Sequence, residues 1–287
     1  MVIDGSATIA ELLTAACGLL AHSAGQAARL ESELLIAHAL DKPRTHLIAW
    51  PDKQLSQEQC SLALSLIKRR RQGEPIAYIT GEREFWSLSL QVTPDTLIPR
   101  PDTECLVARA LELLTDIDSP RVADLGTGSG AIALAIARER HDCQVTATDY
   151  SEKSLAVAQS NAARLVLKNI QFVQGDWCQA LAQDARFDLI ISNPPYIAHD
   201  DPHLQQGDLR FEPTRALVSG KDGLDDIRRI VPQAKHHLAH RGVLLIEHGY
   251  AQGSGVRQIL ESHGYQDIRT LPDCEQRERL TEGFTGL

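Results

Sequence analysis

The chain has 287 residues, with 29 Lys and Arg against 38 Asp and Glu and a formal net charge of −9. Its 43% hydrophobic and 23% charged residues exclude a disordered or fibrous protein, and the length favours two domains. The acidity argues against binding nucleic acid by neutralising phosphates, and residues 9–21 are too short and interrupted to span a membrane. Six cysteines without a CxxC pair and no cationic N-terminal region predict a reduced, cytoplasmic protein.

The segment 1–83 is predicted to form a small helical bundle. Apolar side chains recur at three- and four-residue spacing in residues 10–20, 30–40 and 55–67. Thr8 and Ser56 are predicted N-caps of the first and third helices. The basic run 68–71 ends the third helix. We interpret it as a solvated C-terminus favoured by the helix dipole, with a contact to an acidic partner as the alternative.

Residues 84–98 are predicted to form a β-hairpin linker. Residues 85–92 alternate in polarity like a strand, and Thr93, Pro94 and Asp95 form a turn signal. Residues 98–104 then open a helix that runs to Leu114.

From Arg121 onward, strand-like and helical stretches alternate. The predicted strands are 122–125, 145–148, 170–173, 187–192 and 243–247, with a last pair near 268–271 and Gly283, and the predicted helices are 131–140, 154–167, 225–239 and 254–263. This order predicts an α/β domain over residues 99–287, with parallel strands and helices on both faces. Residues 198–224 lack periodicity, and loops of that length are typically functional.

A glycine loop follows the first predicted strand and consists of Gly126, Thr127, Gly128, Ser129 and Gly130. Here the backbone can approach a ligand closely, and we expect free N–H groups at the following helix N-terminus. Because Gly126, Gly128 and Ala131 also fit the dinucleotide pattern, an NAD enzyme stays open.

Two acidic positions end the next two predicted strands. Asp149 lies 23 residues after Gly126, where a carboxylate suits the ribose hydroxyls of NAD or of S-adenosylmethionine. Asp176 and Trp177 could contact the exocyclic amine and the face of an adenine, although a Trp is often simply part of the core.

The strand 187–192 ends in Asn193, Pro194, Pro195 and Tyr196. The two prolines make a rigid turn without N–H donors, which leaves carbonyl groups free to point into the crevice. We expect the Asn193 side-chain oxygen and the Pro194 carbonyl to accept the two hydrogens of a planar NH2 group, with Tyr196 on its flat face. Two such acceptors stabilise the positive charge that grows on an attacking nitrogen. This turn has no role in an NAD-dependent oxidoreductase.

Together, these motifs resemble class I S-adenosylmethionine-dependent methyltransferases that act on planar nitrogen. More narrowly, they resemble the PrmC/HemK family of N5-glutamine methyltransferases of peptide-chain release factors. Supporting stretches at 84–88, 97–104, 211–213, 223–225 and 247–249 extend the resemblance over nearly the whole chain. One departure is that some relatives carry an aromatic residue where this chain has Leu97 and Ile98.

The resemblance implies a Rossmann-like seven-stranded methyltransferase sheet and a protein substrate, the glutamine in the Gly-Gly-Gln loop of release factors. It also implies that the helical domain and the hairpin help to receive that substrate. S-adenosylmethionine, leaving as S-adenosylhomocysteine, would be bound by Gly126, Thr127, Gly128, Ser129, Gly130, Asp149, Asp176, Trp177 and Asn193. The substrate would be bound by Asn193, Pro194, Pro195 and Tyr196, with Asn193, Pro194 and Tyr196 catalytic.

Other features give weaker indications. His199 and His203 flank two aspartates, but without further ligands we interpret them as a solvated loop and predict no metal. Glu247 and His248 end the fifth central strand without an assigned role. Methylation of amino groups in nucleic acid bases remains the alternative, but it would need a basic groove, and the one strong basic cluster is 68–71. We therefore expect no nucleic acid or membrane partner, and a monomer.

Overall fold

Thr8 and Ser56 begin two helices in the computed structural model, which describes residues 6–286. Each hydroxyl accepts a hydrogen bond from the backbone N–H three residues later, of Glu11 and Gln59 respectively. Those two side chains in turn accept from the N–H of the cap residue. Two backbone donors are thereby satisfied at each helix start. Both predicted N-caps are confirmed.

Backbone contacts divide the chain into two units. The helical unit comprises Met1–Glu82 together with Gln205–Phe211, and the sheet unit comprises Arg83–Leu204 together with Glu212–Leu287. The unperiodic segment 198–224 therefore contributes its middle to the helical unit and its two ends to the sheet unit.

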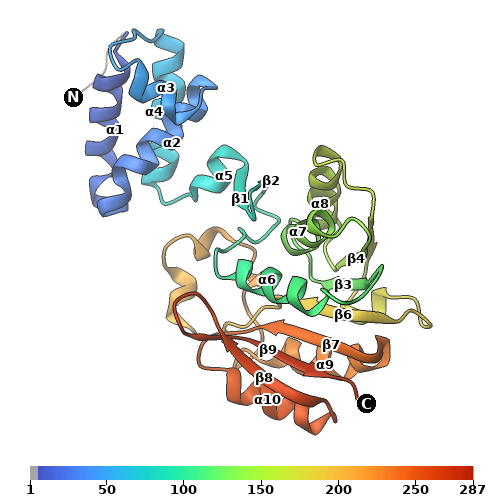
Figure 1. The fold of residues 1–287 in the computed structure, drawn as a ribbon. Helices are drawn as coiled ribbons and strands as arrows, with labels where there is room; N and C mark the ends of the chain where they lie inside the picture. The colour runs from blue at the N-terminus through green and yellow to red at the C-terminus, as the bar shows by residue number, and fades with distance from the viewer. Residues whose placement is uncertain (1–5, 287) are drawn as a thin grey trace. The chain divides into compact units, whose positions relative to one another are not determined.

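The helical unit is built on α1 (Ile9–Ala24), α2 (Ala28–Leu40) and α4 (Gln57–Arg71) (Figure 1). Their buried side chains form one apolar core, which includes Leu12, Leu35 and Ile67. A single 3-10 turn, η1 (Gly25–Ala27), joins α1 to α2. The short helices α3 (Arg44–Ala49) and α5 (Ile76–Thr80) were not predicted, because five or six residues carry too little periodicity to be recognised.

The basic run at the end of α4 is not simply solvated, so our interpretation of it was wrong for two of its members. Arg70 is largely buried and forms ion pairs with Glu31 at 2.8 Å and with Asp208 at 3.0 Å. Arg69 pairs with Glu74 at 2.5 Å. The acidic partners of Arg70 lie in this same chain, one in α2 and one in the segment 205–211. The sequence around the basic run does not reveal them, because both are distant from it along the chain.

The hairpin consists of β1 (Glu82–Phe85) and β2 (Leu88–Gln91). Its turn is at Trp86 and Ser87, with φ of 51° and 58°, and not at the predicted position 93–95. Positive φ at both central residues matches the right-handed twist of a two-residue hairpin, although glycine and asparagine usually supply it. Here the backbone N–H of Trp86 donates to Glu104 at 2.9 Å and its indole N–H donates to Glu139 at 2.9 Å. Contacts with distant residues thus stabilise a turn whose two central positions contain neither glycine nor asparagine.

The sheet unit contains, within residues 6–286, a seven-stranded sheet in the order β5-β4-β3-β6-β7-β9-β8. The strands are β3 (Arg121–Leu125), β4 (Gln144–Asp149), β5 (Ile170–Gln174), β6 (Phe187–Ser192), β7 (Leu238–Glu247), β8 (Gln266–Pro272) and β9 (Glu278–Phe284). The five strands from β5 to β7 are parallel, and β9 lies antiparallel between β7 and β8. The predicted seven-stranded α/β fold is confirmed.

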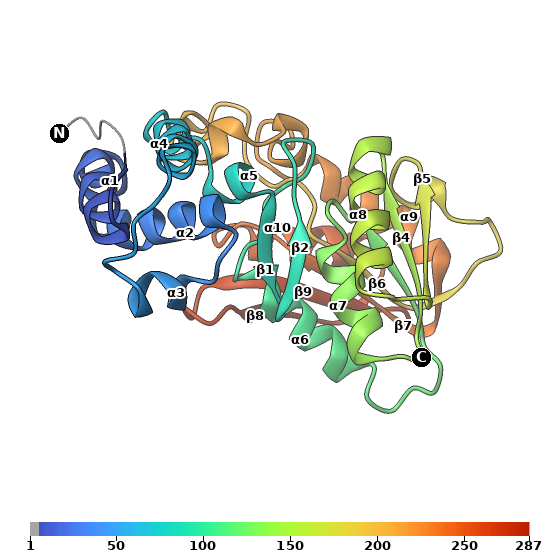
Figure 2. The ribbon, with the colours of Figure 1, turned by 90° about the horizontal axis from the view of Figure 1, so that it is seen from above.

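Helices cover both faces of this sheet. The helices are α6 (Thr103–Leu113), α7 (Ala131–Glu139), α8 (Glu152–Arg164), α9 (Asp225–His237) and α10 (Gly253–Ser262). Figure 1 shows α6, α7 and α8 on one side of the sheet and α9 and α10 on the other. Seen from above, α7 and α8 lie over the strands (Figure 2).

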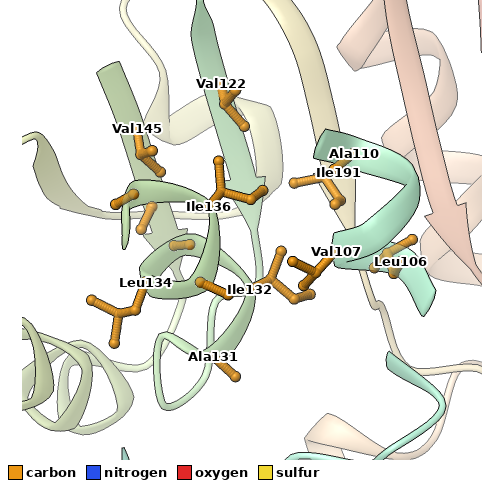
Figure 3. Packing of buried hydrophobic residues seen from close by; sticks show 14 of the residues in the cluster. Leu106, Val107, Ala110, Val122, Ala131, Ile132, Leu134, Ile136, Val145 and Ile191 are labelled. Atoms are coloured by element: carbon orange, nitrogen blue, oxygen red, sulfur yellow. The ribbon is translucent and has the colours of Figure 1, made fainter. Parts of the chain in front are cut away.

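The strand residues alternate between two apolar cores. Leu189 and Ile191 of β6 face the core formed with α6 and α7, whereas Ile190 faces the core formed with α9 and α10. Figure 3 shows Val107 of α6 and Ile132 of α7 close to the strands on the first face. Because both faces are covered, the central strands are apolar throughout and their carboxyl ends form one edge.

The six cysteines are free, and three of them are buried. Cys274 is exposed, and its sulfur lies 3.1 Å from that of Cys105. None of the helices in the described part of the chain combines the length and apolar character that a membrane span requires.

Candidate functional site

A cleft of about 400 Å³ opens at the carboxyl ends of the parallel strands. In open α/β sheets this edge is where ligands bind. The cleft is lined by the residues Pro94, Asp95, Leu97, Gly126, Gly128, Asp149, Tyr150, Ser151, Ser154, Gly175, Asp176, Trp177, Asn193, Pro195, Pro213, Arg215, Ala216, Val218, Asp226 and Arg229. Its walls thus carry four aspartates against two arginines, a balance that favours a cationic ligand.

The backbone of the glycine loop is already hydrogen-bonded within the protein. The N–H groups of Gly126 and Thr127 donate to the Thr148 carbonyl at 2.9 and 2.8 Å, and that of Gly128 donates to Asp149 Oδ2 at 2.9 Å. These three N–H groups of the loop, which precede the helix N-terminus, are therefore not free for a ligand. A pyrophosphate could not use these three donors, because they are already taken within the protein.

The backbone conformation and the surroundings of Gly126 both disfavour a side chain. Its φ is +74°, and a Cβ atom at this position would lie 3.0 Å from the Trp177 ring. Gly126 and Gly128 line the cleft, so the loop presents bare backbone to a ligand. Thr127 and Ser129 are buried behind it, and Gly130 packs against Leu134.

A buried carboxyl group supports the glycine loop from below. Asp124 at the end of β3 is fully buried, and its Oδ2 accepts a hydrogen bond from the Thr127 hydroxyl at 2.6 Å. Its Oδ1 has no partner within residues 6–286. Burial raises the pKa of this carboxyl to about 7, opposed by the Thr127 hydrogen bond. The carboxyl is thus held in place by the loop it supports.

Asp149 lies where the sequence placed it, at the end of β4 and on the cleft wall. Its two carboxylate oxygens accept from the N–H groups of Gly128 and Ser151, at 2.9 and 2.8 Å. Burial raises the pKa of Asp149, and backbone hydrogen bonds together with the charge of Arg215 oppose that shift. Asp149 therefore fixes the glycine loop, and its carboxylate keeps lone pairs that a ligand in the cleft could use.

Asp176 and Trp177 also line the cleft, and both have partners in the protein. Asp176 forms an ion pair with Arg229 of α9, and the Trp177 indole N–H donates to Asp226 at 3.2 Å. Trp177 has a φ of 50°, a conformation that a bulky residue adopts only when its surroundings hold it there. These contacts fix the ring over Gly126.

Of the Asn-Pro-Pro-Tyr turn, residues 193–196, Asn193 and Pro195 line the cleft. The Asn193 side-chain N–H donates to the Thr103 hydroxyl at 3.1 Å, an interaction that leaves its oxygen end for other partners. Pro194 is buried. Burial raises the pKa of the Tyr196 phenol to about 12, with the negative charge of Glu247 acting in the same direction.

The far end of this turn is held by a residue that the sequence did not single out. Gln252 donates to the carbonyls of Tyr196 and Asp222, both at 3.0 Å, and accepts from the Gly249 N–H at 2.8 Å. A Cβ atom on Gly223 would collide with the Tyr196 carbonyl. Gly249 and Gly223 belong to two of the stretches that support the family resemblance, and this packing is their physical role.

Sequence reasoning also missed the wall contributed by the unperiodic segment. Pro213, Arg215, Ala216 and Val218 line the cleft, and the Arg215 guanidinium lies 3.5 Å from the centre of the Tyr150 ring. The one sequence feature that could have indicated this wall is Tyr150, which directly follows the predicted site residue Asp149. Leu97 also lines the cleft, where it contributes an apolar side chain to the wall.

The histidines of the segment 198–224 pair with their own neighbours. His199 lies 2.9 Å from Asp200, and His203 lies 2.7 Å from Asp201, on largely exposed side chains. Among residues 6–286, no three His, Cys, Asp or Glu side chains are grouped to bind one metal ion.

The fold and the cleft define the chain as an S-adenosylmethionine-dependent methyltransferase of the Rossmann-like class, and two family comparisons agree. Residues 11–81 match the PrmC N-terminal domain, and residues 118–270 match a methyltransferase domain. A methyltransferase from Pyrococcus furiosus has a similar fold, with a TM-score of 0.52 and 17% identity over 77% of this chain and 98% of that one.

Curated relatives are considerably closer in sequence. The release factor glutamine methyltransferase of Escherichia coli (strain K12) is 50% identical over 91% of this chain and 93% of its own length. That of Vibrio cholerae is 50% identical over 97% of both chains. The chain belongs to the family of release factor glutamine methyltransferases.

Proposed function

We propose that this enzyme transfers a methyl group from S-adenosylmethionine to the side-chain amide nitrogen, N5, of the glutamine in the Gly-Gly-Gln motif of peptide-chain release factors. The observation that carries the proposal is a single cleft that is lined both by Gly126, Gly128 and Asp149 and by Asn193 of the Asn-Pro-Pro-Tyr turn. A cofactor site and an amide-binding site thereby share one wall.

The residues of the cleft fit S-adenosylmethionine. Bare backbone at Gly126 and Gly128, the carboxylate of Asp149 and the ring of Trp177 suit a methionine chain, a ribose and an adenine. The excess of aspartates suits a cofactor that carries a positive sulfonium. When bound, the cofactor supplies a methyl group activated by that sulfonium.

The chain's own residues act on the glutamine amide. The Asn193 oxygen and the Pro194 carbonyl are the acceptors that we assign to its two N–H groups. They orient the nitrogen and stabilise the positive charge that develops on it. Tyr196, which we place against the flat face of the amide, limits its rotation. The surplus proton leaves to water after transfer, so no strong general base is required.

Labelled S-adenosylmethionine tests the proposal directly. The purified protein should label a release factor, and a Gln→Ala change in the Gly-Gly-Gln loop should abolish the label. Labelling of DNA or RNA with the release factor untouched would overturn the proposal in favour of a nucleic acid methyltransferase.

We extend the proposal to the setting of the reaction. The predicted N-terminal helical domain, residues 1–83, and the hairpin help to receive the release factor, which the monomeric enzyme methylates in the cytoplasm without binding nucleic acid directly. The free, scattered cysteines and the acidic charge support this setting. Sedimentation of the purified enzyme alone and with a release factor tests the monomer and the complex.

A further inference from the structure

Three polar residues from distant parts of the chain meet behind the Asn-Pro-Pro-Tyr turn. Ser192 of β6 pairs with Ile246 of β7, so Asn193 and Glu247 follow them at the same sheet edge. Thr103 is the first residue of α6 and is buried. Asn193 donates to the Thr103 hydroxyl at 3.1 Å, and Thr103 and Asn193 both lie close enough to the Glu247 carboxyl to lower its pKa.

The orientation of the Asn193 amide decides whether it can bind the substrate. Its oxygen and nitrogen ends have nearly the same shape and opposite hydrogen-bonding character. A glutamine NH2 group needs the oxygen end of Asn193 as its acceptor. If the nitrogen end of Asn193 faced it instead, two hydrogen-bond donors would face each other. The protein must therefore fix one of two orientations that differ little in packing.

The hydroxyl of Thr103 can transmit that choice. A hydroxyl group has one proton to donate. If this proton goes to a Glu247 carboxyl oxygen, the Thr103 oxygen is left as an acceptor, and Asn193 must turn its nitrogen toward it. The Asn193 oxygen is then available for the substrate.

We propose that Glu247 and Thr103 are positioning residues that fix the orientation of the Asn193 amide, with its nitrogen on Thr103 and its oxygen available to the glutamine. The inference rests on the proposed function. It gives a role to the carboxyl at the end of β7, which the sequence left without one.

The surroundings of Glu247 indicate that packing alone does not account for it. The residue is 1% exposed, and its Oε2 has no hydrogen-bond partner in the described part of the chain. The charged groups that act on it are Arg279 of β9 and Asp102, just before α6. Burial raises its pKa to about 7, so the ionised form is costly to bury. An apolar side chain would be more stable at this position.

Three variants separate positioning from structure. Glu247→Met removes the acceptor, so the Thr103 proton turns to the Asn193 oxygen and flips the amide. We expect kcat to fall by about 100-fold, the loss typical of a misplaced reacting group, with the Kd for the cofactor nearly unchanged. Thr103→Val removes the relay without forcing a flip, and we expect a loss of about tenfold.

The double variant gives the decisive result. With Val at position 103, nothing forces the amide to flip, so Thr103→Val should restore activity to Glu247→Met, up to the level of Thr103→Val alone. Two independent structural defects would instead combine to a larger loss. Thr103→Ser keeps the hydroxyl and should recover most of the loss caused by Thr103→Val.

A matched control is Glu282→Gln, which changes another buried carboxyl on the neighbouring strand β9, paired with Arg109. It should change Tm and leave kcat within about twofold, as distant sites usually behave independently. Wild-type levels of kcat in both Glu247→Met and Thr103→Val, or a double variant worse than either, would overturn the inference. If the wild type itself labels no release factor, the proposed function fails instead.

Discussion

The glycine loop after β3 and the Asn-Pro-Pro-Tyr turn after β6 leave the same edge of the sheet on adjacent strands. Each is backed by a buried carboxyl, Asp124 and Glu247, whose pKa burial raises to about 7. Each carboxyl also has one oxygen without a partner among the described residues, and a threonine beside it. The glycine loop and the turn are thus supported by the same kind of group, a buried carboxyl beside a threonine.

They differ in where the supporting contacts come from. Asp124 is linked to Thr127, three residues along the chain, whereas Glu247 faces groups that are more than 50 residues away in sequence, Thr103 and Asn193. The glycine loop offers backbone to its ligand, and the turn offers a side chain whose orientation must be set. The glycine loop is also held by Thr148 and Asp149 of the adjacent strand β4, whereas the oriented amide requires partners from a helix and from another strand. Four predictions test this comparison.

Asn193→Ala should have the largest effect. Removing one fixed acceptor from a developing charge should lower kcat by about 100- to 1000-fold. The Kd for S-adenosylmethionine should change little, since Asp149 and the glycine loop remain. Single-turnover rates and calorimetric titration of the cofactor measure the two quantities. Equal losses in both would contradict the separation of the two elements.

The two buried carboxyls should make stability depend on pH. Burial raises the pKa of Glu247 from its ordinary value of 4.5 to about 7, so the unfolding free energy falls as pH rises through this window. The expected fall is about 3 kcal/mol at most for one carboxyl. Urea unfolding at pH 5 and pH 8 should show a smaller fall in Glu247→Met than in the wild type. A slope unchanged by this variant would refute the assignment, and Glu261→Ala, on the exposed side of α10, serves as the control.

Asp149→Ala should show the opposite kinetic pattern to Asn193→Ala. Loss of a charged acceptor for ribose, about 2 kcal/mol, should weaken cofactor binding by roughly 30-fold. At saturating cofactor, kcat should stay close to that of the wild type. Calorimetry with S-adenosylhomocysteine checks the affinity, again with Glu261→Ala as the control. Unchanged affinity would remove Asp149 from the cofactor site.

Gly126→Ala should have the smallest effect. A side chain at φ +74° costs about 1–2 kcal/mol, and its Cβ would also crowd the Trp177 ring. The matched control is Gly18→Ala in the exposed part of α1, where a Cβ meets nothing within 4 Å. It should raise stability by about 0.5–1 kcal/mol. Thermal unfolding of both variants gives the comparison, and equal shifts of the same sign would contradict it.

Much of the fold was predictable because its signals are local. The caps at Thr8 and Ser56, the alternation of strands and helices and the order of the motifs depend on residues a few positions apart. The errors occurred where distant contacts decide. The hairpin turn at Trp86 and Ser87 depends on Glu104 and Glu139, and the basic run ending α4 is neutralised by carboxylates of α2 and of the segment 205–211.

The sequence by itself determined which chemistry the chain carries. A glycine loop, an aspartate after the next strand and an Asn-Pro-Pro-Tyr turn are each short motifs, and together they predicted a cofactor edge and a turn that accepts a planar NH2 group. Only the tertiary structure decided how these residues are held. The antiparallel insertion of β9, the wall at Arg215 and the meeting of Thr103, Asn193 and Glu247 join segments that are far apart in sequence. Contacts of that kind depend on the packing of the whole sheet, and no local pattern records them.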